Sequence, residues 1–124
     1  MDTFALGRSL IDTFARGWSK ASVDTVMSVF TEQARFIETP FSAPLVGQAA
    51  IRRWWADVPY YQSEITVSTG EIYGAGPWFA TEFKAVFRRR RTGEWVDARG
   101  AIFCEIEAEL ISEMRLYWHR NAGR

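Results

Sequence analysis

Glu38 is the first candidate for chemistry in this sequence. It is the only carboxylate between Ala34 and Trp55, in a segment of mostly apolar and small residues. A charged side chain among residues that favour burial is costly unless it is paired or used. A carboxylate in an apolar pocket can act as a general base or acid. The alternative is a strand-end carboxylate that pairs with an arginine or reaches solvent at the mouth of a pocket.

His119, Asp97 and Arg99 are the next candidates. His119 is the only histidine, and an imidazole exchanges protons near neutral pH. Strand alternation places it on the opposite face from Trp118, so we expect a surface or interface residue. Asp97 and Arg99 share one side of a strand, where they could orient a water if that side faced a pocket. The other side is apolar and is expected to face inward, so we predict a cross-strand salt bridge at a subunit interface. That apolar side comprises Val96, Ala98, Ile102, Cys104 and Ile106.

Other reactive or charged residues are interpreted as structural. The basic run from Arg88 to Arg91 precedes a Thr-Gly turn and marks the solvated end of a hairpin, so we predict no nucleic-acid binding. Cys104 has no evident positive neighbour that would activate a thiolate and is interpreted as a core residue. With one histidine and no HExxH or CxxC spacing, we predict neither a metal site nor a cofactor. A solvated edge is indicated by Glu105, Glu107 and Glu109.

Composition limits the class of protein. The 124 residues suffice for one domain, predicted to span 1–124, and 15 basic side chains balance 15 acidic ones. Nothing in this charge steers the chain toward nucleic acid or an anionic membrane. No segment approaches the ~20 apolar residues of a membrane span. The lone Cys104 favours a reducing compartment, so we expect a cytoplasmic protein. Nine Phe, six Trp and four Tyr must fill a large core or line a pocket.

The elements that position these residues begin with helices. Helical spacing predicts one helix through Phe4, Ile11, Phe14 and Trp18, and a second whose apolar set runs from Val23 to Phe30. Ser22 is placed as the N-cap of the second. A short strand over 34–38 leads into a loop at Pro40 and Pro44. A third helix opens at Gly47, carries Ile51, Trp54, Trp55 and Val58, and is expected to stop at Pro59.

After Tyr61 the apolar pattern changes to period two, which predicts four long antiparallel strands. Helices followed by strands indicate an α+β fold, with three helices in the N-terminal half packed on one face of a sheet. The expected turn near 107–109 contains no glycine. The strands are carried by Ile65 and Val67, by alternate residues from Phe79 to Phe87, by those from Val96 to Ile106, and by Met114, Leu116 and Trp118.

Four segments, FARGW, VDTVMSVFTEQARF, PLVGQAAIRRWW and EMRLYWHR, resemble one superfamily over nearly the whole chain. It is the cone-shaped fold shared by nuclear transport factor 2, SnoaL-type polyketide cyclases, limonene epoxide hydrolase and bacterial ketosteroid isomerase. The resemblance implies a curved sheet wrapped around helices, a deep apolar pocket and a homodimer. Trp95 and Tyr117, which are expected to face away from the pocket, support the dimer.

The segment from Phe14 to Trp55 aligns with ketosteroid isomerase without a gap, and the resemblance then implies roles for its residues. Glu38 falls on the aspartate general base, Trp55 on a pocket tyrosine, and Phe14 on the tyrosine that donates to the enolate oxygen. The second donor, a protonated aspartate, falls on Ala101 or Ile102. Because neither donor is kept, ketosteroid isomerisation by the family mechanism is not expected. The ligand-binding residues implied are Phe14, Trp55, Phe83, Met114, Leu116 and Trp118.

The other relatives also match only in part. SnoaL-like chains often end in Tyr-Trp-Asp, whereas this chain has Tyr117, Trp118 and His119. The Asp-Arg-Asp set of the hydrolase has only Asp97 and Arg99, in reversed order, as a counterpart. We therefore expect a pocket for a hydrophobic or aromatic small molecule, with Glu38 as general base of a cofactor-independent isomerase, cyclase or hydrolase. The alternative is a non-catalytic ligand-binding or protein-interaction module.

Overall fold

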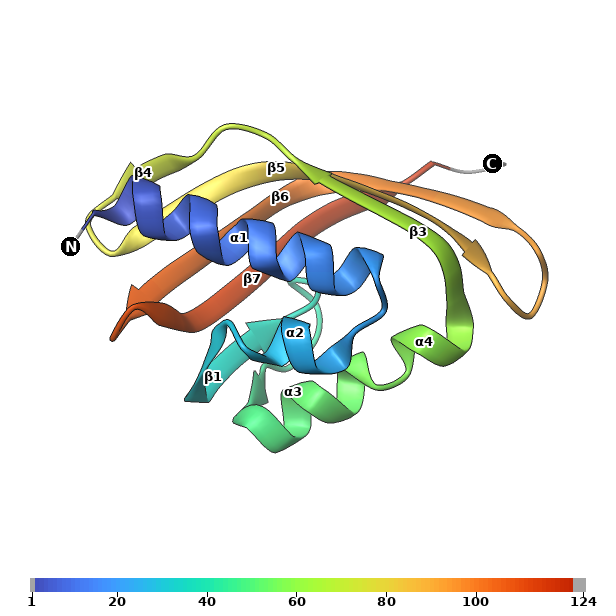
Figure 1. The fold of residues 1–124 in the computed structure, drawn as a ribbon, viewed down its shortest axis with the longest axis horizontal. Helices are drawn as coiled ribbons and strands as arrows, with labels where there is room; N and C mark the ends of the chain where they lie inside the picture. The colour runs from blue at the N-terminus through green and yellow to red at the C-terminus, as the bar shows by residue number, and fades with distance from the viewer. Residues whose placement is uncertain (1, 122–124) are drawn as a thin grey trace.

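The computed structural model describes residues 2–121, so residues 1 and 122–124 of the predicted domain lie outside the described residues. Helices and one curved sheet form the α+β arrangement expected (Figure 1). The helices are α1 (Thr3–Ser19), α2 (Val23–Met27), α3 (Gln48–Trp55) and α4 (Val58–Tyr61). The strands are β1 (Phe30–Ile37), β2 (Leu45–Val46), β3 (Gln62–Thr69), β4 (Tyr73–Ala75), β5 (Trp78–Arg89), β6 (Trp95–Glu107) and β7 (Leu110–Arg120).

The sheet has the strand order β2-β1-β7-β6-β5-β3, with β4 paired to β5. The four predicted antiparallel strands are β3, β5, β6 and β7, and the pairing of β1 with β7 is the parallel exception. The short strands β2 and β4 were not predicted. Figure 1 shows α1 lying across one face of the long strands, which leaves the other face uncovered by helices.

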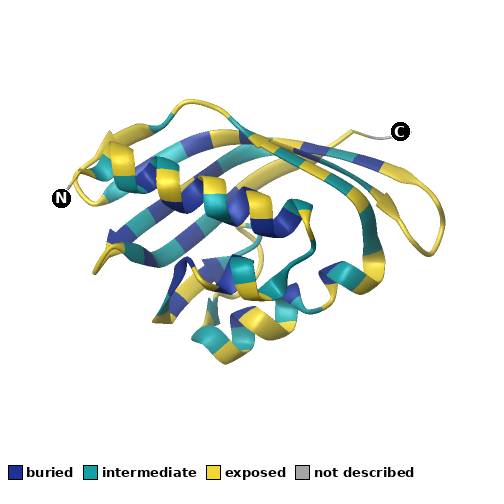
Figure 2. Cartoon of the chain, in the orientation of Figure 1, coloured by how far each residue is buried: buried dark blue, intermediate teal, exposed yellow. Residues whose placement is uncertain are grey.

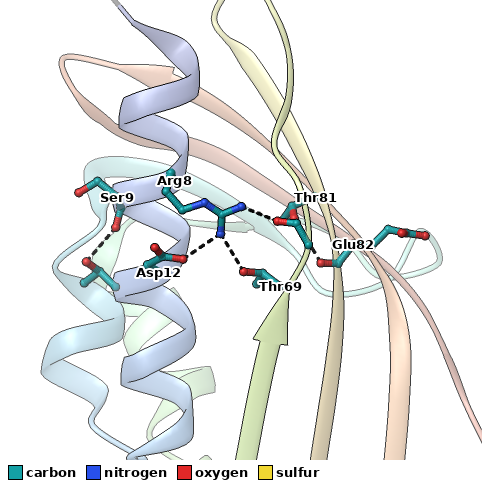
Figure 3. Close-up of polar contacts among 8 residues, drawn as sticks. Arg8, Ser9, Asp12, Thr69, Thr81 and Glu82 are labelled. Carbon is teal, nitrogen blue, oxygen red and sulfur yellow. Dashed lines mark hydrogen bonds and ion pairs between the residues drawn. The ribbon is translucent and has the colours of Figure 1, made fainter.

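Polar contacts fix the N-terminal half of helix α1. The side chain of Asp2 accepts a hydrogen bond from the backbone N–H of Ala5 (3.1 Å), which caps the helix. Arg8 forms an ion pair with Asp12 (3.0 Å) and donates to Thr69 Oγ1 (3.2 Å) and to the carbonyl of Gly70, so it ties α1 to the end of β3 (Figure 3). The contacts of Arg8 hold this part of α1 against the end of β3.

The second and third helices differ from the prediction at their ends. Ser22 caps α2 as predicted, with its hydroxyl accepting from the N–H of Thr25 (3.4 Å). The helix ends at Met27, however, and Phe30 begins β1, since it pairs with Ile111 of β7. The predicted end of the third helix at Pro59 was wrong, because α3 ends at Trp55. Pro59 instead lies in the first turn of α4, where its missing N–H costs no hydrogen bond.

The core lies between the helices and the inner face of the sheet, and Figure 2 shows buried residues alternating along the long strands. On β6 the predicted inward side, from Val96 to Ile106, is buried. Cys104 is part of this core, and burial raises the pKa of its thiol well above the ordinary value. The turn after β6 needs no glycine because Ala108 and Glu109 adopt the left-handed conformation, with φ of 51° and 66°.

Candidate functional site

A cavity of about 230 Å³ opens between the helices and the inner face of the sheet. Its floor is apolar and buried, with Trp18 from α1 facing Phe83, Val96, Ala98 and Leu116 from the long strands. The opening of the cavity is surrounded by four exposed residues, Tyr61, Arg89, Trp118 and Arg120. Half-buried Glu38, Trp54, Gln62 and Phe87 complete the wall. The cavity is therefore lined by apolar residues at one end and by charged residues at the other.

Glu38 lies on the cavity wall directly after β1. Its backbone carbonyl accepts a hydrogen bond from the indole Nε1 of Trp118 (3.0 Å), which ties the segment after β1 to β7. Within residues 2–121, no side chain forms a hydrogen bond or an ion pair with the Glu38 carboxylate. The predicted alternative of pairing with an arginine is thus not found among the described residues. The carboxylate remains available to a ligand or a water.

Gln62 is a second polar group on the wall, and its orientation follows from its partner. The indole N–H of Trp18 donates to Gln62 Oε1 (3.0 Å). Because an indole nitrogen can only donate, the amide oxygen must face Trp18, and the amide NH₂ is directed elsewhere. Gln62 therefore offers two N–H groups to its surroundings on the cavity wall.

Two arginines stand at the charged end and share one carboxylate. Arg120 Nη2 lies 2.9 Å from Glu94 Oε2, and Arg89 Nε lies 3.4 Å from Glu94 Oε1. All three side chains are partly exposed, at 34% for Arg120 and 44% for the other two. Solvent screening at such exposure keeps each pair weak, roughly 0–1 kcal/mol. The rim therefore carries positive charge that is only loosely neutralised.

The predicted site residues divide into two groups. Glu38, Phe83, Leu116 and Trp118 come together on the cavity wall. Phe14, Trp55 and Met114 lie in the packed core, with exposures of 0%, 1% and 0%, and do not line the cavity.

Trp18 explains why Phe14 and Trp55 lie behind the wall. Its ring packs edge-on against both, with centroids 6.1 Å from Phe14 and 5.4 Å from Trp55. Trp18 itself lines the cavity, so it separates the other two rings from any ligand there. The indole Nε1 of Trp55 is buried without a hydrogen-bond partner among residues 2–121.

Neither position expected to carry the second oxyanion donor reaches the cavity. Ile102 is fully buried and Ala101 lies on the other side of β6. Together with the phenyl ring of Phe14, this leaves the cavity without the two side-chain donors of ketosteroid isomerase. The lining residues whose side chains can still donate are Trp54, Tyr61, Gln62 and the two arginines.

Sequence reasoning missed Arg89 and Arg120 as cavity residues, although a signal was present. Arg89 continues the inward alternation of Phe83 and Phe87 on β5, and Arg120 continues that of Leu116 and Trp118 on β7. Period two alone would have placed both on the pocket side. Trp18, Tyr61 and Gln62 had no comparable local signal as cavity residues.

The remaining candidates lie away from the cavity. His119 is exposed on the outer face of the sheet, as predicted. Asp97 and Arg99 contact each other within β6, with 3.1 Å between Arg99 Nε and Asp97 Oδ1, and a cross-strand bridge at a subunit interface stays a prediction. The hydrogen bond to Asp97, and then its charge, raise the pKa of Arg99. Within residues 2–121, no three His, Cys, Asp or Glu side chains gather to hold a metal ion. The same residues include no helix long and apolar enough to cross a bilayer.

The helices, the curved sheet and the cavity between them define a cone-shaped α+β protein of the ketosteroid-isomerase-like class. Within that class, the chain belongs to the SnoaL-like domain family, whose family model matches residues 11–114. The resemblance inferred from the sequence is thereby confirmed. A search of curated proteins gives no match.

Solved structures of similar fold carry several different descriptions. A putative isomerase from Bacillus subtilis is 19% identical, with a TM-score of 0.85, over 96% of this chain and 90% of its own. The epoxide hydrolase/cyclase-like enzyme SalBIII, described in pyran ring formation in the polyether salinomycin, is 20% identical with a TM-score of 0.79, over 90% and 89%. A putative SnoaL-like polyketide cyclase from Jannaschia sp. CCS1 is 12% identical with a TM-score of 0.81, over 95% and 88%. At such identities the similarity establishes the fold alone.

Proposed function

We propose that this protein binds a hydrophobic or aromatic small molecule in the cavity and that Glu38 acts on it as a general base, without a cofactor. The observation that carries the proposal is that Glu38 lines a mainly apolar cavity and that its carboxylate has no partner among residues 2–121. Such a group can take a proton from a carbon next to a carbonyl, or from an attacking water. Isomerisation, cyclisation and hydrolysis all use one of these two steps.

Negative charge that develops on the ligand would need donors other than those of ketosteroid isomerase. The cavity offers the amide of Gln62, the hydroxyl of Tyr61 and the guanidinium groups of Arg89 and Arg120. Losing one preorganised oxyanion donor typically costs about a hundredfold or more in rate. A reaction in this cavity is therefore expected to place its developing charge at the polar end. The volume of about 230 Å³ is below the roughly 300–1,000 Å³ of most ligand pockets and favours a compact ligand.

Turnover of enone and epoxide substrates tests the catalytic proposal. Glu38→Gln keeps the shape of the side chain and removes the base, so it should lower kcat by a factor of about 100 or more. Glu32→Gln is the matched control, because Glu32 is an exposed residue of β1 away from the cavity. If both variants turn over substrate at the rate of the parent protein, Glu38 is not the base.

A binding module that holds a ligand without transforming it is the second candidate. It is favoured by the apolar residues at the two donor positions, Phe14 and Ala101 or Ile102. A protein-interaction module, whose cavity is incidental, is a further variant of this alternative. Tight ligand binding with no turnover, unchanged in Glu38→Gln, would support the binding module.

A homodimer formed through the outer face of the sheet is also part of the proposal. Trp95, Phe103 and Tyr117 are 41%, 42% and 42% exposed, which is high for large aromatic side chains. Phe103 and Tyr117 pack edge to face with centroids 5.6 Å apart. Phe103→Lys should convert a dimer to a monomer in light scattering. A parent protein that is already monomeric would contradict this part.

We also propose a cytoplasmic location, because Cys104 is the only cysteine. A single domain is proposed because the helices and the sheet share one core.

A further inference from the structure

The chemistry of the rim indicates which small molecules the cavity would accept. Arg89 comes from the end of β5, Arg120 from the end of β7, and Glu94 from the turn that joins β5 to β6. Glu94 is the one acidic side chain that contacts either arginine within residues 2–121. Two guanidinium groups thus share one carboxylate, so Arg89, Arg120 and Glu94 together carry a net charge of about +1.

The arginines also retain unused donors. A guanidinium group has five N–H donors, and the contacts with Glu94 occupy Nε of Arg89 and Nη2 of Arg120. Planar N–H pairs of this kind bind carboxylates in a bidentate manner. The exposure of both side chains leaves room for an incoming group beside Glu94.

We propose that Arg89 and Arg120 bind the carboxylate of an amphipathic monoanion whose apolar body occupies the cavity. This inference rests on the proposed ligand-binding function and narrows its ligand class to small aromatic or aliphatic carboxylic acids. One negative charge matches the excess of one positive charge at the rim. A dianion is disfavoured, because Glu94 at the rim and Glu38 on the wall would repel the second charge.

The order of residues along β7 fixes the direction of the ligand. Arg120, Trp118 and Leu116 follow one another along the inward side, from the exposed rim to the buried floor. Glu38 is held beside Trp118 by the hydrogen bond to its carbonyl. A ligand anchored by its carboxylate at Arg120 therefore passes Glu38 before its apolar end reaches Leu116 and Phe83.

Matched pairs of acids and primary amides test the inference. The probes are phenylacetate, cinnamate and 2-naphthoate with their amides, titrated by calorimetry and by the fluorescence of the cavity residues Trp18, Trp54 and Trp118. The acid of at least one pair should bind about tenfold tighter than its amide, since hydrogen bonds to a charged acceptor are roughly twice as strong as neutral ones. Arg89→Gln and Arg120→Gln should each remove most of that preference. Arg91→Gln, which removes a positive charge outside the cavity, should leave it intact.

Glu94→Gln is expected to increase the affinity for acids, a result that a misfolded variant would not give. Removing the shared carboxylate leaves both arginines available, so acids should bind several-fold tighter while amides are unaffected. Equal binding of acids and amides, with no effect of the three rim variants, would overturn the inference and leave the cavity as a ligand site. Failure of every acid and every amide to bind would overturn both this inference and the proposed function.

Discussion

Substituting Gly100 by alanine should destabilise the protein and displace the cavity wall. Gly100 lies on β6 in register with Phe83 of β5 and Trp118 of β7, both of which line the cavity. A Cβ atom added there would lie 1.8 Å from the carbonyl oxygen of Tyr117 and 2.6 Å from the Cα of Trp118. These are backbone atoms, so the clash can be relieved only by separating β6 from β7.

The size of the effect follows from what must move. Overpacking that shifts backbone typically costs about 1–3 kcal/mol, and loss of one ladder hydrogen bond adds about 1 kcal/mol. We therefore expect Gly100→Ala to lower the free energy of unfolding in urea by about 2–4 kcal/mol. Gly70→Ala is the matched control, because its added Cβ would meet only ordinary contacts at 3.9 Å. A Gly100→Ala protein as stable as the control would refute the close approach of β6 and β7.

Two further predictions concern buried groups. Trp18→Phe should destabilise more than Trp55→Phe, by about 1 kcal/mol, because only the indole N–H of Trp18 has a partner, Gln62, to lose; equal losses in urea unfolding would count against this difference. Cys104 should make stability fall as pH rises above the ordinary thiol value of 9.0, because its raised pKa keeps the folded state protonated while the unfolded state loses the proton. The contribution of Cys104 to the slope of the unfolding free energy against pH should approach about 1.4 kcal/mol per pH unit. Cys104→Ala should lack this contribution, whereas identical pH profiles for the two proteins would contradict the prediction.

Much of the fold was predictable because its signals are local. Period-two alternation predicted the four long strands and the inward side of β6, and Ser22 predicted the start of α2. Pairing partners are not local, which explains why the parallel pairing of β1 with β7 was not foreseen. Pro59 was misassigned because a proline suits the first turn of a new helix as well as the end of an old one.

The candidate site was less predictable, for a physical reason. A helical pattern shows that Phe14 faces inward, but not whether another ring stands between it and a cavity. Trp18 does so, and that follows from packing among distant segments. On the strands, alternation sufficed to place Phe83, Leu116 and Trp118, but it did not show that Met114, on the same side of β7, lies in the packed core instead of the cavity wall. Arg89 obeys the same rule but was interpreted as part of a basic run at the end of a hairpin, and Arg120 was not singled out from the sequence.

The central claim is that a ligand occupies the cavity beside Glu38. The most direct test is a crystal structure of the protein after soaking with an aromatic acid that binds in solution. The predicted result is density between Trp18, Phe83 and Trp118, with the ligand carboxylate at Arg120 and a ligand atom or water within hydrogen-bond reach of the Glu38 carboxylate. Density for the bound ligand on the outer face of the sheet, with the cavity closed by the ring of Trp118, would contradict the claim.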